Sequence, residues 1–211
     1  MSLYEFCVSR LTTRRALLRS ASVIAGTALC ADVHFASSSP QLASSASNRP
    51  EPGLDSKIMR ELAAWTRQSL DTPNPVPFGA AVVRTDSAER LVRSLNTVSP
   101  ENDPSAHAEV HTIRLACTKL KSSSLKGYTL YTTCEPCPMC MACALWAGLD
   151  RVVYGATIAD AARFTHQIRI PAAELVKRSD FRCMVDGPVE RDLCLALFTD
   201  PKMQKILQKW N

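Results

Sequence analysis

Two segments of the chain, thirty residues apart, each combine a helix-start signal with side chains that bind metal ions. In the first, Asp103-Pro104 is typical of a helix N-terminus, so we expect His107 and Glu109 near the start of that helix. In the second, Cys137-Pro138-Met139-Cys140 places two thiols three residues apart at another helix start, where the helix dipole favours the thiolate. Both segments reach one ion only if the fold brings two helix N-termini together.

This set of side chains indicates zinc with one open coordination position. His107, Cys137 and Cys140 supply three ligands, whereas zinc takes four. A catalytic zinc site leaves the fourth position to water, whose pKa then falls to about 7. We do not count Glu109 as a ligand and expect it to carry protons beside that position. Such a site suits attack of water on an amidine-like carbon with loss of ammonia, and we expect one Zn²⁺ per chain.

Other interpretations of the same residues stay open. Cys134 and Cys143 flank the ligand pair at the same spacing, so the four thiols are also compatible with a closed structural zinc site or with disulfides. His111 stands four residues after His107, as in a metalloprotease pair, but the acid of that motif directly follows the first His. We therefore interpret His111 as a surface or packing residue.

The pattern from residue 55 to residue 155 alternates between helix and strand. We expect helices over residues 55–70, 104–121 and 138–147, and strands over residues 78–85, 89–95, 128–133 and 151–155. Further along, residues 171–179, 189–199 and 201–210 have helical patterns, and residues 182–185 suit an edge strand. Strands joined through helices predict an α/β fold with helices on both faces of a sheet that has a parallel core.

The first 35 residues are typical of a twin-arginine export signal. Arg14 and Arg15 precede an uncharged apolar run over residues 21–31, which is too short to span a bilayer. We expect an exported, periplasmic protein; the alternatives are an organelle transit peptide, removed after import, or an ordinary amphipathic helix. Residues 36–52, rich in Ser, Ala and Pro, are predicted to be a flexible linker before a folded domain over residues 53–211.

Composition limits the partners. Hydrophobic residues make up 46% of the 211, enough for a core, and no charge-free apolar run reaches 18 residues, which argues against a stable membrane span. The net charge is +5, but residues 1–49 carry five Arg against two acids, so the remainder holds 20 basic and 18 acidic residues. This balance argues against a nucleic-acid partner, although Lys202, Lys205 and Lys209 space positive charge along the last predicted helix.

The chain resembles the cytidine and deoxycytidylate deaminase superfamily, and within it the bacterial guanine deaminases and related nucleoside deaminases. The resemblance covers some 40% of the chain, from about residue 77 to residue 162. Its motifs are Pro77-Phe78-Gly79-Ala80, Asn96, Asn102-Asp103-Pro104-Ser105-Ala106-His107-Ala108-Glu109-Val110 and Tyr131-Thr132-Thr133-Cys134-Glu135-Pro136-Cys137-Pro138-Met139-Cys140. The paired His-x-Glu and Pro-Cys-x-x-Cys motifs are the signature of zinc deaminases.

The resemblance implies a three-layer αβα sandwich around a five-stranded mixed sheet, and a homodimer or larger assembly. It implies that His107, Cys137 and Cys140 hold zinc and that Glu109 is the proton shuttle. It also implies that Asn96 hydrogen-bonds the substrate and that Phe78 packs on the base. The expected reaction is hydrolytic deamination of a small purine base or nucleoside, guanine or guanosine; the alternatives are deamination of adenosine in a transfer RNA and a non-catalytic zinc module.

One segment departs from the guanine deaminase pattern. After Asp160-Ala161-Ala162, those enzymes continue with Gly-Phe-Asp-Asp, whose acid reads the guanine edge. This chain instead has Arg163-Phe164-Thr165-His166-Gln167. The departure puts guanine specificity in doubt and makes His166 a candidate substrate contact, with an exposed loop histidine as the alternative.

Overall fold

The computed structural model describes residues 53–210. The predicted export signal in residues 1–35 and the predicted linker in residues 36–52 lie outside the described residues. No helix within residues 53–210 is long and apolar enough to cross a membrane.

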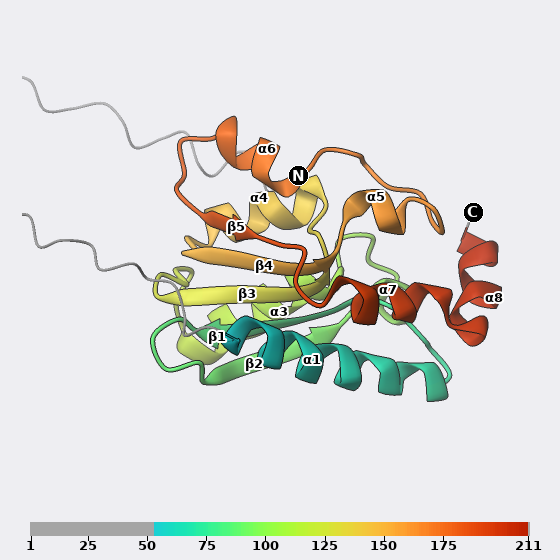
Figure 1. Ribbon diagram of the computed structural model, residues 1–211. Helices are drawn as coiled ribbons and strands as arrows, with labels where there is room; N and C mark the ends of the chain where they lie inside the picture. The colour runs from blue at the N-terminus through green and yellow to red at the C-terminus, as the bar shows by residue number, and fades with distance from the viewer. Residues whose placement is uncertain (1–52, 211) are drawn as a thin grey trace, which may run out of the picture. The chain divides into compact units, whose positions relative to one another are not determined.

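A five-stranded mixed sheet in the order β2-β1-β3-β4-β5 forms the centre of the domain (Figure 1). Strand β1 runs antiparallel to β2 and β3, whereas β3, β4 and β5 run parallel to one another. The strands are β1 (Gly79–Arg84), β2 (Arg90–Leu95), β3 (Tyr128–Cys134), β4 (Arg151–Ala156) and β5 (Met184–Asp186). The predicted fold class, a mixed sheet with a parallel part between helices, is confirmed.

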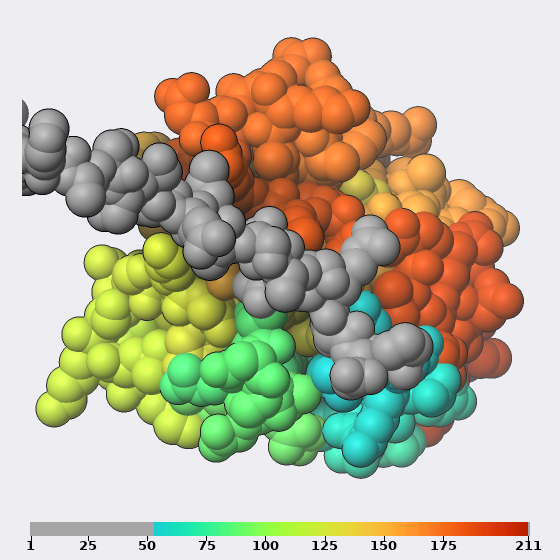
Figure 2. Space-filling model, turned by 60° about the vertical axis from the view of Figure 1, so that its left-hand side comes forward, coloured from blue at the N-terminus to red at the C-terminus, as the bar shows by residue number. Residues whose placement is uncertain are grey.

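Helices cover both faces of this sheet because alternate strand residues point to opposite sides. Val83 and Val153 belong to the core on one face, and their neighbours Val82 and Val152 belong to the core on the other. The first core includes residues of α1 (Leu54–Arg67), α7 (Arg191–Thr199) and α8 (Pro201–Trp210). The second includes residues of α3 (Ala108–Leu120), α4 (Pro138–Trp146) and α6 (Ala172–Lys177). Figure 2 accordingly shows α1, in cyan, and the orange surface around α6 at opposite edges of the molecule.

The predicted helix start at Asp103 is wrong. Helix α3 begins at Ala108, with His107 as its N-cap residue. The Asp103 carboxylate accepts hydrogen bonds from the backbone N–H (2.8 Å) and the hydroxyl (2.6 Å) of Ser105, so this acid closes a turn two residues long instead of capping a helix. The correction moves His107 and Glu109 closer to the helix terminus than we expected.

Two short helices, α2 (Val98–Glu101) and α5 (Ile158–Ala161), were missed between the predicted elements. Each is four residues long, too short to show the periodic spacing of apolar residues on which helix prediction depends. The helix predicted over residues 55–70 corresponds to α1 and to the 3₁₀ turn η1 (Gln68–Asp71) that continues it.

The sheet register brings three of the site segments to one edge. Gly79 pairs with Leu95, so Phe78 before β1 and Asn96 after β2 lie side by side, and the backbone N–H of Asn96 donates to the carbonyl of Phe78 (3.1 Å). Because β3 is antiparallel to β1, its last residue, Cys134, reaches the same edge. Helices α3 and α4 begin beside this edge, so the fold gathers the predicted site residues from four separate segments.

Candidate active site

The structure brings the three predicted metal ligands together. The His107 Nδ1 atom lies 3.7 Å from the Cys137 Sγ atom and 3.5 Å from the Cys140 Sγ atom, and the two sulfur atoms are 3.5 Å apart. His107 is the N-cap residue of α3 and Cys137 is the N-cap residue of α4. Two helix N-termini therefore meet at one point, as the spacing of the metal-binding residues required.

These distances fit a zinc ion. Zinc–sulfur bonds of about 2.3 Å and zinc–nitrogen bonds of about 2.0 Å at tetrahedral angles place neighbouring ligand atoms about 3.5 to 3.8 Å apart. All three separations in the structure fall in that range. An imidazole with two thiolates is also a donor set that zinc prefers.

Close packing of the three donors shifts their pKa values in opposite directions. The hydrogen-bonding contact with Cys140 and the imidazole of His107 lower the pKa of Cys137 to about 4. The same contact with Cys137 raises the pKa of His107. The Cys137 sulfur, together with burial, raises the pKa of Cys140. A bound cation would stabilise the thiolate form of both cysteines.

Glu109 lies two residues into the same helix terminus as His107 and is not a member of the ligand group. Its side chain is buried, with 5% of the residue exposed, and burial raises its pKa to about 7. A carboxyl group with a pKa near neutrality both accepts and releases protons, which is what general acid–base catalysis requires.

The flanking cysteines do not complete the ligand set. Among the His, Cys, Asp and Glu residues of the described chain, the group that converges around a point contains His107, Cys137 and Cys140. Cys134 is buried and directs its thiol toward the carbonyl oxygen of Thr157, 3.9 Å away. The cluster therefore has three protein ligands, as expected of an open site and not of a closed structural one.

A cavity of about 340 Å³ opens beside this cluster. Asn96 and Phe78 both line it, as do His107, Glu109 and Cys137. The Asn96 side-chain oxygen accepts the backbone N–H of Val98 (3.1 Å), which leaves its NH₂ group to donate toward the cavity. Phe78 is held edge-on against Phe198, with ring centroids 5.3 Å apart. The structure thus places five of the six predicted site residues at one cavity, and the sixth, Cys140, belongs to the ligand group beside it.

Residues that sequence reasoning did not select also line the cavity: Val98, Ser99, Cys134, Glu135, Thr165, Gln167 and Trp210. His166, which the sequence offered as a candidate contact, is among the lining residues as well. Trp210 comes from α8, whose packing through the buried residues Met203 and Leu207 brings the end of the helix to the site. Cys134 and Glu135 belong to the motif over residues 131–140, whereas no local motif marks Val98, Ser99 or Trp210, which only the tertiary fold brings to the cavity.

Glu135 lines the cavity but already has partners for both carboxylate oxygens. One accepts the backbone N–H of Ile158 (3.0 Å) and the other that of Ala172 (2.9 Å). Ile158 and Ala172 are the first residues of α5 and α6, so this carboxylate fixes both ends of the segment that carries residues 165–167.

Comparison with known proteins agrees with this arrangement. Residues 53–156 match the family described as the cytidine and deoxycytidylate deaminase zinc-binding region. The chain belongs to the cytidine and deoxycytidylate deaminase superfamily. The matched residues include His107, Cys137 and Cys140 together with Glu109, Asn96 and Phe78, and the family is described by its zinc-binding region, so zinc is the cofactor that this region binds.

Relatives in the superfamily carry two different names. The guanine deaminase of Bacillus subtilis (strain 168) is 45% identical over 86 residues, which are 41% of this chain and 54% of that protein. The tRNA-specific adenosine deaminase of Agrobacterium fabrum is 41% identical over 96 residues, or 46% of this chain and 62% of that protein. The chain thus spans between about half and two thirds of the length of these relatives.

A solved structure shares the fold. The guanine deaminase from Nitrosomonas europaea superimposes with a TM-score of 0.60 at 24% identity, over 77% of this chain and 85% of the other. The likeness therefore extends past the matched family region into the C-terminal third of the chain, where the sequence departs from the guanine deaminase pattern.

Proposed function

We propose that this protein is a zinc-dependent hydrolytic deaminase of a free purine base or nucleoside, guanine or guanosine. The observation that carries the proposal is the convergence of His107, Cys137 and Cys140 at the wall of a cavity that also contains a buried acid, Glu109. The B. subtilis guanine deaminase, 45% identical to this chain over 86 residues, supports a purine substrate.

The roles of the side chains follow from their positions. His107, Cys137 and Cys140 would hold Zn²⁺, which supplies a Lewis acid that lowers the pKa of water to about 7. Glu109 would accept one proton from water and donate it to the ring nitrogen, and it would then take a second proton from the hydroxyl added to the carbon and donate it to the departing amine. In the net reaction a carbon–oxygen bond forms, the carbon–nitrogen bond breaks, and ammonia is released.

The other residues that line the cavity would select the substrate. The Asn96 NH₂ group faces an acceptor on the base, and Phe78 offers an aromatic edge and face for packing. Residues 165–167 contribute a hydroxyl, an imidazole and an amide where guanine deaminases place an acid. These groups donate as well as accept hydrogen bonds, so they suit a purine edge that carries an oxygen acceptor.

The second candidate function is deamination of adenosine in a transfer RNA. It is supported by the A. fabrum relative, whose name specifies that activity and which is 41% identical to this chain over 96 residues. It predicts activity on an anticodon stem-loop and none on free purines.

An ammonia-release assay tests both candidates. The zinc-loaded protein would be incubated with guanine, guanosine, adenine, adenosine, cytosine, cytidine and a transfer-RNA stem-loop. We expect release from guanine or guanosine, its loss on chelation of zinc, and its loss in Glu109→Ala with zinc content unchanged. Release from the stem-loop alone supports the second candidate. Two outcomes would favour a non-catalytic zinc module instead. One is no ammonia release from any substrate although the protein holds one zinc per chain, and the other is unchanged function in Glu109→Ala.

We also propose that the protein is exported by the twin-arginine route and acts as a homodimer. Sequencing the N-terminus of the native protein tests export, because an intact N-terminus on a cytoplasmic protein would contradict it. Sedimentation equilibrium of the domain over residues 53–211 tests the dimer.

A further inference from the structure

One wall of the cavity is built by the segment that links β2 to α3. Asn96, Val98 and Ser99 of this segment line the cavity. The N-terminus of α3 contributes His107, its N-cap residue, and Glu109 to the same cavity. The relative position of substrate contact and proton shuttle therefore depends on how firmly the segment is held against α3.

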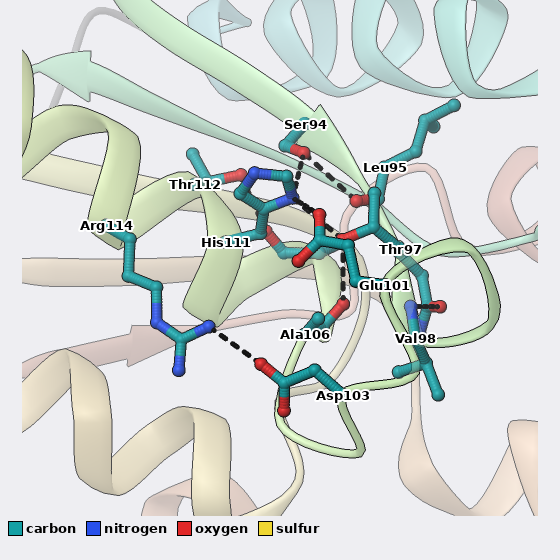
Figure 3. A network of polar contacts seen from close by, with 12 residues as sticks. Ser94, Leu95, Thr97, Val98, Glu101, Asp103, Ala106, His111, Thr112 and Arg114 are labelled. Carbon is teal, nitrogen blue, oxygen red and sulfur yellow. Dashed lines mark hydrogen bonds and ion pairs between the residues drawn. The ribbon is translucent and has the colours of Figure 1, made fainter.

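His111 connects the segment between β2 and α3 to helix α3. It lies one turn beyond His107 on α3, and its backbone N–H donates to the His107 carbonyl (2.9 Å). Its Nδ1 atom lies 2.9 Å from the Thr97 hydroxyl and 3.1 Å from the Ser94 hydroxyl (Figure 3). Thr97 directly follows Asn96, and Ser94 belongs to β2. The His111 ring thus contacts both the end of β2, through Ser94, and the start of the segment that follows β2, through Thr97.

The hydroxyl partners determine which way these bonds run. The Ser94 hydroxyl donates to the Leu95 carbonyl (3.0 Å), and the Thr97 hydroxyl reaches the Ala106 carbonyl (3.5 Å). A hydroxyl has one proton, so both oxygens are left to accept from the ring. In the tautomer that carries its proton on Nδ1, the ring donates to both the Ser94 and the Thr97 hydroxyl, and the Glu101 carboxylate lies 3.8 Å away.

The far end of the segment has a separate attachment. Arg114, one turn further along α3, contacts the Asp103 carboxylate from its partly exposed side chain (3.2 Å; Figure 3). It also contacts the Ser105 hydroxyl (3.0 Å). With this end tied by Arg114, loss of the His111 contacts would loosen chiefly the end that carries Asn96.

We infer that His111 is a positioning residue, which holds Asn96 and the adjoining cavity wall in register with the residues at the start of α3. The inference rests on the proposed function, since it assigns the consequence to substrate binding. His111 does not line the cavity, so its effect passes through Thr97 to Asn96.

The test compares His111→Leu with His111→Asn in the zinc-loaded protein. Leucine removes the donor, whereas the asparagine NH₂ group replaces Nδ1 as a donor of similar reach. We expect His111→Leu to raise KM about tenfold with a smaller effect on kcat, as loss of hydrogen bonds of ordinary strength implies. We expect His111→Asn to recover most of this loss. Lys119→Ala, an exposed change on the same helix that removes a bond to the Leu91 carbonyl, is the matched control with unchanged kinetics.

A second measurement needs no substrate. The Thr97 amide donates to the Ala106 carbonyl (3.0 Å) and the Val98 amide to the Asn96 side chain (3.1 Å). We expect hydrogen exchange at both amides to become about tenfold faster in His111→Leu and to stay near the wild-type rate in His111→Asn. If His111→Leu does not fold, Thr97→Val removes the other partner and should accelerate exchange at the Val98 amide. Unchanged exchange in the folded variants would overturn the inference, even if the proposed reaction is not observed.

Discussion

Replacing Glu135 tests whether its carboxylate holds in place the segment that brings residues 165–167 to the cavity. Its two oxygens accept the backbone N–H groups of Ile158 and Ala172, and the residue is only 8% exposed. Glu135→Ala leaves both N–H groups without their acceptor in a buried place. Glu135→Gln keeps one acceptor oxygen and turns an NH₂ group toward the other N–H, so one bond becomes a contact between two donors.

The magnitude follows from these two bonds. A buried donor that loses its partner destabilises a protein by about 1 to 3 kcal/mol, so we expect Glu135→Ala to lower the free energy of unfolding by about 4 kcal/mol. One bond is retained in Glu135→Gln, for which we expect about 2 kcal/mol. Against a total of about 5 to 15 kcal/mol for a domain, either loss is readily measured by urea unfolding monitored by tryptophan fluorescence.

The matched control is Glu174→Ala, which removes an ion pair with Arg178 on the surface of α6. Exposed pairs contribute about 0 to 1 kcal/mol, so this variant should unfold near the wild-type midpoint. If the segment opens locally, amide exchange at Ile158 and Ala172 will accelerate before global unfolding changes. The reasoning is refuted if Glu135→Ala unfolds within 1 kcal/mol of wild type with unchanged exchange at both amides.

Three further outcomes are expected. Glu109→Gln should reduce kcat by at least about 100-fold, with zinc content by mass spectrometry unchanged, because the proton carrier is lost and the ligands remain. Arg151→Met should lower the free energy of unfolding by about 3 kcal/mol, since the buried guanidinium bonds Asp55 and Asp186. Burial raises the pKa of Asp55, but bonds from Arg151 and Tyr131 outweigh this and leave it below its ordinary value. The contribution of ionised Asp55 to the free energy of unfolding is therefore present above about pH 4 and lost as pH falls through the folded-state pKa. Urea unfolding midpoints measured between pH 2 and pH 6 should show this decline in the wild type and a smaller decline in Arg151→Met. Gly155→Ala should destabilise the fold by about 3 kcal/mol, because the added carbon would lie 2.2 Å from the Cys194 sulfur and 2.8 Å from the Thr133 carbonyl; Cys194→Ala should restore only part of the loss.

The sheet and its long helices were predictable because their signals are local. Alternating or continuous apolar runs marked the strands, and Pro138 at the start of α4 marked a helix terminus that the structure shows at the same residue. The start of α3 was misplaced because Asp103 followed by Pro104 suits both a cap and a turn. Only the Ser105 contacts, which depend on the folded loop, decide between them.

The positions of residues 165–167 and Trp210 in the cavity wall could not be predicted from the sequence, for a different reason. Residues 165–167 lie in a segment whose ends are held by Glu135, more than twenty residues away along the chain, and Trp210 arrives through the packing of α8. Neither position depends on the residues beside it in sequence. A single sequence therefore identifies the metal-binding and catalytic residues at the strand ends. The residues that would select the substrate can be identified only from the tertiary structure.

The metal cluster was predictable because its geometry is set by two helix ends. His107 and Cys137 both stand at N-cap positions in extended conformation, with φ and ψ of −62° and 152° and of −63° and 166°. Neither side chain caps its own helix, although a capping side chain contributes about 1 kcal/mol. The two positions that capping residues ordinarily occupy are thus given to ligands, whose side chains turn away from the helix toward each other. A metal ion shared by the two helix ends would offset the stability that both forgo.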